Sequence, residues 1–364
     1  MLNPSAPRRA LVAGCVAGAV LIAAAAPAPA QPVPDYDFQW SVIGAPGNRA
    51  ANEQEAPVLF HPVLYPPNGL QVGAVNYEYR MARTEVTVSQ WFEFVQAYAP
   101  YYTGPAPGTS MGSSDWVLTG QWIAPIAGSG QNGQPWQFTM DPAAANLATG
   151  TSWHFAARYA NWLHNGKAHE QWAFETGVYD TSTFTRNPDG TWNDQFTPAP
   201  GARFWLPTLD EWTKGMYYDP HRYGEGQEGY WRYPFGRDTF AVPGYPEDGG
   251  ETAAGLPYPP DFDAHWWTPV GAYPHITSPW GLLDGSGGGP SAEWTTSGDE
   301  WGRWAQGSGQ FGGDTAYLYD QIDYLGMGGL SGGGGAFRLA SAIPAPSSVL
   351  IFCLTVPLLE RRKR

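Results

Sequence analysis

Cysteine is almost missing from this chain of 364 residues, which holds only Cys15 and Cys353, one near each end. The long interval between them therefore carries no internal disulfide, no zinc–thiolate site and no cysteine nucleophile. Charged residues are also scarce, at 14%. Residues 31–346 carry 13 basic and 32 acidic side chains, a net charge of −19. We expect no nucleic acid partner, because phosphate binding needs clustered lysine and arginine.

Glycine, proline and aromatic residues are abundant instead, with 46 Gly, 35 Pro, 18 Trp, 20 Tyr and 16 Phe. So many aromatic side chains argue against disorder. Together with the glycines and prolines they predict a loop-rich fold in which Trp and Tyr hold irregular segments in place. The length allows one large domain or two ordinary ones, and an acidic surface suits solubility outside the cell.

The first 30 residues have the layout of a secretory signal. Arg8 and Arg9 supply the positive start, residues 10–26 form an alanine-rich apolar run, and Ala28-Pro29-Ala30 matches the small-residue cleavage pattern. The alternative is an uncleaved membrane anchor. Because the run is alanine-rich and a proline-containing stretch follows at once, we expect cleavage by signal peptidase.

The last residues, 341–364, form a three-part tail. A Pro-Ala-Pro at 344–346 precedes an eleven-residue apolar run, Val349–Leu359, and then basic residues. Pro357 interrupts this run, which is shorter than the roughly 20 residues of a membrane span. The tail resembles a PEP-CTERM sorting signal, with Ala345 in place of glutamate, which implies processing by an exosortase-like protease. The alternative is a plain C-terminal anchor. Both interpretations place the domain outside the cytoplasm, and only the tail would meet the membrane.

A strand ends and a helix begins between residues 203 and 212. Phe204–Leu206 is a short apolar run, and Pro207 ends it by removing a backbone donor. Thr208 and Glu211 have the spacing of a capping box, in which the hydroxyl accepts from the third helical amide and the carboxylate accepts from the amide of the cap residue. We predict a helix that starts at residue 209.

Two more helices are predicted earlier in the chain. Thr87 and Gln90 form a second capping box, which follows a strand-like alternation over residues 77–86. Residues 151–163 are predicted to form the other helix. Its apolar stripe consists of Trp153, Ala156, Ala160 and Leu163.

Six stretches occur in the order found in one protein family. They are Thr84-Glu85-Val86-Thr87, the run from Ser152-Trp153 to Trp162-Leu163, Leu206-Pro207-Thr208 to Trp212, Tyr233-Pro234-Phe235-Gly236, the run from Gly281 to Trp294, and Ala336-Phe337-Arg338. This set resembles the sulfatase-modifying factor family of formylglycine-generating enzyme-like domains. The resemblance implies a single loop-rich α+β domain related to C-type lectins, with few short strands and two to three main helices. In the fifth stretch two residues are inserted and Gly288 replaces an asparagine.

The resemblance divides the chain into a signal at 1–30, an extended N-terminal segment at 31–76, the family-like domain at 77–340 and the sorting tail at 341–364. The founding enzyme of the family holds Cu(I) with two cysteines, and hydroxyls or carboxylates do not replace soft thiolates. The corresponding interval, residues 312–319, has no cysteine. We therefore expect neither copper nor formylglycine generation, so the chain is interpreted as a pseudoenzyme.

Other metals are weighed in the same way. An iron-binding branch of the family uses histidines of an added N-terminal domain, which is missing here, and the seven histidines are interpreted as surface or loop residues. Calcium remains, because the resemblance places Glu293 at a calcium-associated glutamate, Asp284 is close in sequence, and oxygen ligands suit calcium. The alternative is that Glu293 accepts hydrogen bonds from loop amides and Asp284 caps a turn.

Tryptophans gather in the late loops, after a Pro-, Gly- and Asp-rich loop predicted at 241–264. They are Trp266, Trp267, Trp280, Trp301 and Trp304. Exposed Trp and Tyr rings stack well on sugars and peptides, so these five are candidate ligand-binding residues. The alternative is that they are core residues of a loop-rich domain.

These observations lead to two hypotheses. The first is an exported, cell-surface or extracellular, non-catalytic domain that serves as a binding or scaffold module for a glycan or a protein. The second is an enzyme with carboxylate-based chemistry on an extracellular substrate. Two acidic pairs could serve it, Asp210 with Glu211 and Asp299 with Glu300, although helix capping already explains the first pair.

Overall fold

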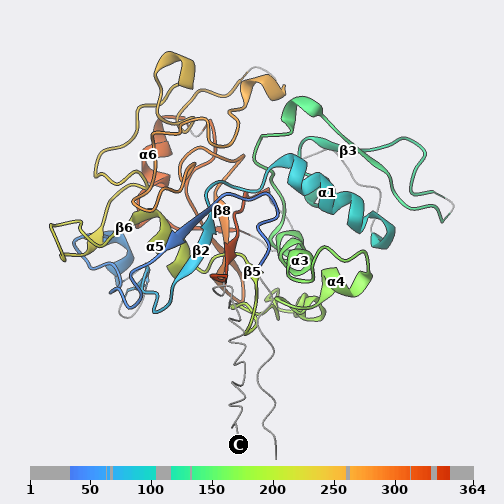
Figure 1. Ribbon diagram of the computed structural model, residues 1–364, viewed down its shortest axis with the longest axis horizontal. Helices are drawn as coiled ribbons and strands as arrows, with labels where there is room; N and C mark the ends of the chain where they lie inside the picture. The colour runs from blue at the N-terminus through green and yellow to red at the C-terminus, as the bar shows by residue number, and fades with distance from the viewer. Residues whose placement is uncertain are drawn as a thin grey trace, which may run out of the picture. The chain divides into compact units, whose positions relative to one another are not determined.

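The centre of the domain is a four-stranded antiparallel sheet with the order β1-β2-β11-β5 (Figure 1). Its strands are β1 (Trp40–Ile43), β2 (Tyr79–Ala82), β11 (Ala340–Ser341) and β5 (Phe204–Trp205). The segment predicted as extended, 31–76, therefore contributes an edge strand. All four residues of β2 are buried. The alternation in the sequence therefore does not correspond to one solvent-exposed and one buried face of this strand.

The computed structural model describes residues 33–62, 64–65, 69–103, 116–131, 133–259, 263–311, 313–328 and 334–344. They belong to one compact unit, Val33–Pro344. The predicted signal at 1–30 and the part of the predicted tail from 345 onward lie outside the described residues. Within these ranges, no helix has the length and apolar character needed to cross a bilayer.

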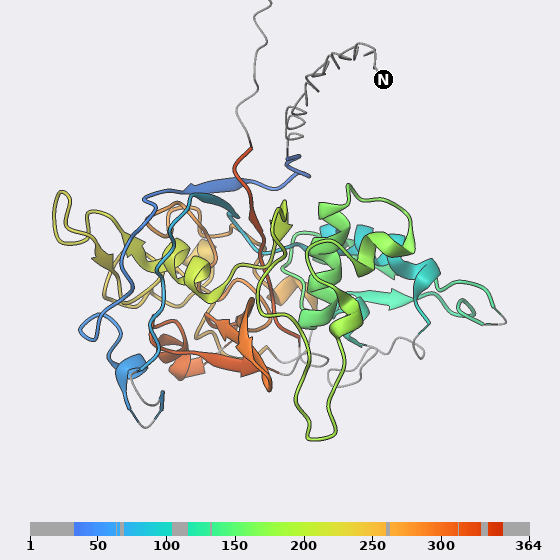
Figure 2. The same ribbon diagram turned by 90° about the horizontal axis from the view of Figure 1, so that it is seen from below.

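A second antiparallel sheet is formed late in the chain, in the order β10-β9-β8 (Figure 2). It consists of β8 (Glu293–Asp299), β9 (Gly302–Gln306) and β10 (Gly326–Gly328). Two further strand pairs are short. In one, β3 (Ile123–Pro125) pairs with β4 (Phe138–Met140), and in the other β6 (Tyr218–Asp219) pairs with β7 (Gly229–Tyr230). Near Arg338 only Ala340 and Ser341 join the central sheet, and Ala336 makes an isolated bridge to Glu293.

Three main helices are present, as predicted: α1 (Val88–Tyr98), α3 (Trp153–His164) and α5 (Leu209–Tyr217). Both capping boxes are confirmed. In the second, Thr208 Oγ1 accepts from the Glu211 amide at 3.1 Å, and the Thr208 amide donates to Glu211 Oε2 at 2.7 Å. Short helices are α2 (Trp116–Thr119), α4 (Gln171–Glu175) and α6 (Ala316–Tyr319). The 3-10 turns are η1 (Pro57–Phe60), η2 (Ala99–Tyr101), η3 (Pro142–Ala144), η4 (Thr181–Thr183), η5 (Pro246–Asp248), η6 (Ala264–Trp266) and η7 (Gly313–Thr315).

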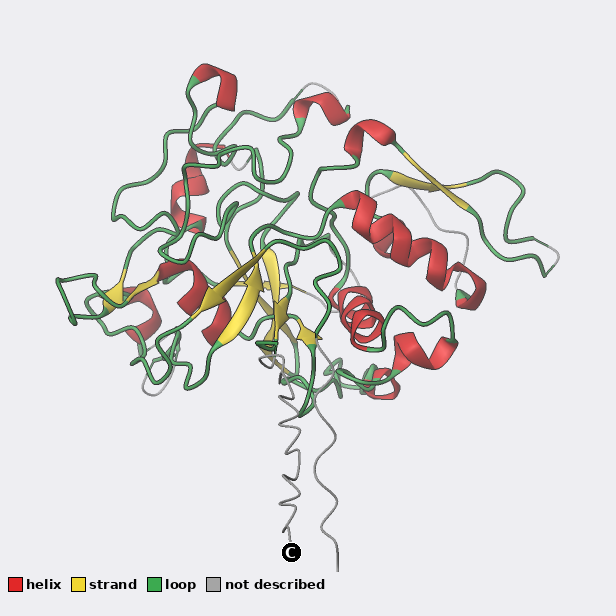
Figure 3. Ribbon diagram, in the orientation of Figure 1, coloured by secondary structure: helices red, strands yellow, loops and turns green. Residues whose placement is uncertain are grey.

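Aromatic rings join α1 and α3 to the end of the chain. Trp91 and Tyr159 lie 5.6 Å apart, and Phe337 packs edge-on against both, at 5.8 and 5.7 Å. The predicted stripe on α3 is fully buried. Loops connect short elements throughout the drawing (Figure 3). The fold is therefore a loop-rich α+β domain whose core is fastened by aromatic side chains, as the composition predicted.

Candidate functional site

A buried arginine organises the centre of the family-like motifs. Arg338 is fully buried, and its Nη2 and Nε donate to Glu293 Oε1 and Oε2 at 2.6 and 2.7 Å. Its remaining donors reach the carbonyls of Ala82, Arg83 and Leu283. Glu85, also buried, lies 3.8 Å from the guanidinium. Burial and the neighbouring Glu293 raise the pKa of Glu85 well above its usual value.

The two predicted calcium ligands both have protein partners. Glu293 is held by Arg338 and also accepts from Trp212 Nε1 at 3.1 Å. Asp284 Oδ2 accepts from the Gly271 amide at 2.6 Å, and burial raises the pKa of Asp284 to about 6. A cation at Glu293 would face the Arg338 guanidinium, so this donor set does not suit calcium. In the described ranges, no three His, Cys, Asp or Glu side chains are arranged to hold a metal ion.

Three residues of the acidic pairs, Asp210, Glu211 and Asp299, accept hydrogen bonds from protein groups. Glu211 is fully buried and accepts from the Thr208 amide, from Trp205 Nε1 and from the Tyr77 hydroxyl. Asp299 Oδ1 accepts from the amides of the β8–β9 turn, at 2.8 and 3.2 Å. Helix capping and turn capping therefore account for these residues, which do not converge with each other on one hollow.

The five candidate tryptophans have different surroundings. Trp280 stacks near Tyr218, Trp304 packs near Tyr65, and Trp301 is 56% exposed in the β8–β9 turn. Only two of the five, Trp266 and Trp267, line the same hollow. Of the five predicted ligand-binding tryptophans, Trp266 and Trp267 therefore share one hollow, and the other three lie elsewhere.

That hollow, here called the Trp266 hollow, has a volume of about 450 Å³. Its lining is Tyr245, Pro246, Glu247, His265, Trp266, Trp267, Thr268 and Pro269. Its lining comes from η5, η6 and the residues next to them, and both turns are drawn above the central sheet in Figure 1. Trp266 is half-buried, whereas Glu247 and His265 are exposed. The arrangement offers aromatic faces beside polar groups that can donate and accept hydrogen bonds.

Local turn chemistry explains why the chain forms this hollow. Asp263 Oδ1 caps η6 by accepting from the His265 amide at 3.1 Å. Gly249 ends η5 with φ of +80°, a conformation that favours glycine. Sequence reasoning missed Tyr245, Glu247 and His265, although the Tyr-Pro-Glu-Asp-Gly stretch could have indicated a turn that presents side chains, within what was predicted as plain loop.

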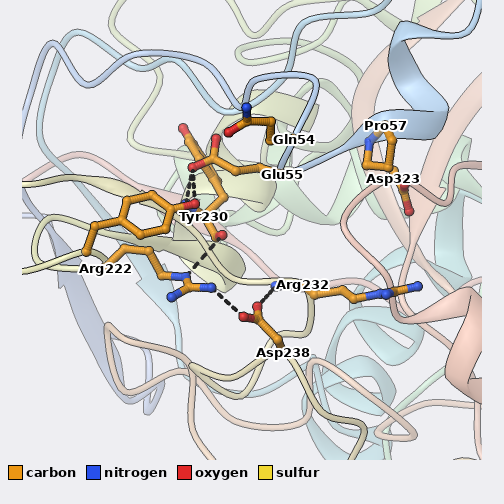
Figure 4. A pocket seen from close by; sticks show the side chains of 9 residues that line it. Gln54, Glu55, Pro57, Arg222, Tyr230, Arg232, Asp238 and Asp323 are labelled. Carbon is orange, nitrogen blue, oxygen red and sulfur yellow. Dashed lines mark hydrogen bonds and ion pairs between the residues drawn. The ribbon is translucent and has the colours of Figure 1, made fainter.

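A second hollow, of about 330 Å³, is lined by charged side chains and tyrosines (Figure 4). Glu55 pairs with Arg49, and Asp238 pairs with Arg222. Arg222 also lies 3.6 Å from the ring centre of Trp231. These two pairs neutralise their own charges, while Arg232 donates to Gln321 and Asp323 accepts from the Val58 amide.

One histidine contradicts the prediction that the histidines are surface or loop residues. His154 lies in α3, is buried, and has Nε2 at 2.7 Å from Asp194 Oδ2. Burial lowers the pKa of His154, and the charges of Arg158 and Arg303 act in the same direction. The sequence carried no signal for this pair, because Asp194 comes from a loop forty residues away.

No protein-family model matches the chain, and no curated protein matches it. Among solved structures, CarF is similar with a TM-score of 0.43 and 16% identity, over 85% of this chain and 99% of that one. Treponema denticola variable protein 1 gives 0.43 and 17% over 84% and 95%. PvdO from Pseudomonas aeruginosa gives 0.37 and 14% over 84% and 92%. These similarities carry no information on ligand or activity.

Proposed function

We propose that this chain is an exported, non-catalytic domain of the sulfatase-modifying factor type, with a C-type-lectin-related fold, that binds a carbohydrate at the Trp266 hollow. The observation that carries the proposal is the hollow itself, where the rings of Tyr245 and Trp266 stand beside Glu247 and His265. Aromatic rings stack on the apolar faces of sugars, while carboxylate and imidazole groups bind hydroxyls.

The interior supports a non-catalytic role. Cysteine is missing from residues 33–344, so the thiolate chemistry of the resembled enzymes has no ligand. Glu85, Glu211 and Glu293 are buried and engaged with protein groups. The motifs that carry the resemblance therefore supply structural contacts, while binding is assigned to a loop hollow that they do not form.

Export and surface location belong to the same proposal. They rest on the signal pattern at 1–30 and on the sorting-like tail at 341–364. The net charge of −19 over residues 31–346 fits an extracellular domain that stays soluble. Signal peptidase and an exosortase-like protease are the processing partners that this proposal implies.

A glycan array with the purified protein tests the binding proposal. Trp266→Ala should abolish the array signal, since its ring provides the open face of the hollow. Trp172→Ala is the matched control, because Trp172 is 54% exposed on α4 and should leave the signal unchanged. An array that stays flat with the unaltered protein would reject carbohydrate binding.

The alternative is a carboxylate-based enzyme, and one observation favours it. Burial raises the pKa of Asp320 to about 7, a value suited to proton transfer at neutral pH. Asp320 accepts from the Ser286 hydroxyl at 2.5 Å and from the Ser308 amide at 2.7 Å. If sugars bound on the array are also cleaved, and Asp320→Asn stops cleavage without weakening binding, the alternative replaces the first proposal.

A further inference from the structure

A third hollow adjoins the Trp266 hollow. This Tyr258 hollow has a volume of about 370 Å³. Its lining includes Tyr258, Ser308, Gln310, Phe311, Tyr319 and Tyr324. Nothing in the sequence pattern indicated it, because its residues come from four separate segments of the chain, the last of which includes Tyr319 of α6 and Gly326 of β10. Its rings are tyrosines and a phenylalanine rather than the tryptophans that drew attention to the late loops.

The two hollows share a wall of two aromatic rings. Trp267 lines the first and Phe311 lines the second, and their ring centres lie 5.1 Å apart with planes at 87°. Both side chains are buried, so the two rings form the wall that separates the hollows. The elements that border the hollows, η5, η6 and α6, are all drawn above the central sheet in Figure 1.

Hydrogen bonds hold the two hollows at a set spacing. Gln310, in the Tyr258 hollow, accepts from the Thr268 amide at 2.9 Å, and its Nε2 donates to the Thr268 carbonyl at 3.0 Å. The same Nε2 reaches the Gly288 carbonyl at 3.1 Å. Thr268 belongs to the lining of the Trp266 hollow. A single side chain therefore joins the backbones of the two linings, so they keep one relative position.

The backbone at the junction is strained. Phe311 has φ of +60°, which is unusual for a residue with a bulky side chain. Such conformations persist where surrounding contacts impose them, and they concentrate at functional sites. The contacts here are Trp267, the exposed ring of Tyr258 at 6.0 Å, and the Ala253 carbonyl, which accepts from the Phe311 amide at 3.3 Å.

The open rings of the Tyr258 hollow face solvent. Tyr258 is 72% exposed and Tyr324 is 40% exposed, with Tyr319 4.7 Å from Tyr324. The remaining lining offers hydroxyl, amide and backbone groups and no ionisable acid or base other than the tyrosines. An uncharged ligand with many hydroxyls matches this lining. A polyanion does not, because residues 31–346 carry a net charge of −19.

We infer that the Trp266 and Tyr258 hollows are two subsites for one neutral oligosaccharide chain, so that the protein recognises an extended polysaccharide rather than a terminal sugar. This inference rests on the proposed carbohydrate binding at the Trp266 hollow. Two linked subsites raise affinity with ligand length, since the second sugar contact is made within the same molecule.

The test uses oligomers derived from cellulose, chitin, mannan and xylan, each as disaccharide, tetrasaccharide and octasaccharide, with calorimetry on the full protein. For the oligomer series that binds, affinity should rise at least about tenfold from disaccharide to octasaccharide. The double variant Tyr258→Ala, Tyr324→Ala should remove this gain and leave disaccharide affinity unchanged. Both side chains are exposed, so folding should be unaffected; Trp172→Ala is again the control.

The outcomes separate the inference from the proposal beneath it. Disaccharide binding that depends on Trp266 but gains nothing with length overturns the two-subsite inference and leaves the proposed function standing. Length-dependent binding that survives the double tyrosine variant also overturns it. Absence of binding to every oligomer rejects both the two-subsite inference and the proposed carbohydrate binding. Both are also rejected if no sugar binds and a proline-rich peptide binds tightly in a way that Trp266→Ala abolishes.

Discussion

Two fully buried arginines show how differently one residue type can be accommodated. Arg338 uses both oxygens of Glu293 and three carbonyls, and although burial opposes its charge, Glu293 and Glu85 raise its pKa above the usual value. Arg303 lies between the rings of Trp153 and Phe196, 4.2 and 4.5 Å from their centres. Burial lowers the pKa of Arg303 to about 10.

The difference lies in what compensates the lost hydration. Arg338 exchanges water for a bidentate carboxylate, the strongest geometry available to a guanidinium. Arg303 donates to the Gln195 carbonyl at 2.9 Å and lies 3.7 Å from Asp194, and its Nε and Nη1 have no hydrogen-bond partner among the described residues. Burying a charge therefore costs little free energy only where anions or carbonyl groups surround it. Aromatic faces compensate the lost hydration less well.

Arg338→Met should have the largest effect. It leaves Glu293 and Glu85 buried without their cation, which costs about 3–5 kcal/mol. Urea unfolding followed by tryptophan fluorescence would measure the loss. If the variant kept its full stability at neutral pH, the central role given to Arg338 would be wrong.

Asp320 extends the comparison to a buried acid that lacks a cation. Burial raises its pKa from the usual 3.8 to about 7. The folded state therefore holds the proton more tightly, and this contribution to stability, present in full below about pH 4, is lost as pH rises through 7. Between pH 5 and pH 8 the loss should be about 2–3 kcal/mol.

Thermal unfolding of the unaltered protein and of Asp320→Asn across this pH range isolates that contribution. The asparagine variant cannot titrate at this position, so the difference in unfolding temperature between the two proteins should change with pH. A constant difference from pH 5 to pH 8 would show that Asp320 stays ionised in the folded protein.

Arg303→Met should cost less than Arg338→Met, about 1–2 kcal/mol, because Asp194 keeps His154 as a partner. The same variant should raise the pKa of His154, since the charge of Arg303 is one of the causes that lower it. Proton NMR titration of the histidine resonances would measure the pKa of His154 in both proteins. An unchanged His154 pKa would contradict the proposed coupling.

Glu211→Gln should have the smallest effect, within about 1 kcal/mol, because glutamine also completes a capping box. Glu211 accepts only from neutral donors, and burial raises its pKa. Glu293→Gln is the matched comparison and should cost more, since it removes the carboxylate that binds Arg338 through both oxygens. Equal costs for the two variants would remove the distinction between capped and ion-paired carboxylates.

Local chemistry was readable from the sequence. Both capping boxes and the buried stripe of α3 depend on residues within one or two helical turns, so spacing along the chain is enough to predict them. The strand β1 was not predicted, because a short edge strand becomes a strand only when β2 is beside it. The pairing of Glu293 with Arg338 likewise joins positions forty-five residues apart.

The candidate site shows the same limit. Trp266 and Trp267 were singled out because tryptophans are rare and chemically distinctive, but the sequence could not separate them from Trp280 and Trp304, which pack elsewhere. Exposure and neighbours decide whether a ring binds a ligand or fills a gap, and both are properties of the folded chain.

The sequence by itself determined the helix starts, the loop-rich α+β class and the absence of cysteine from residues 33–344, because these follow from near neighbours or from composition. Only the tertiary structure decided that Glu293 binds Arg338 and that Trp267 and Phe311 pack against each other between two hollows. Contacts between distant segments depend on how the loops pack in three dimensions. The spacing of residues along the chain does not predict that packing.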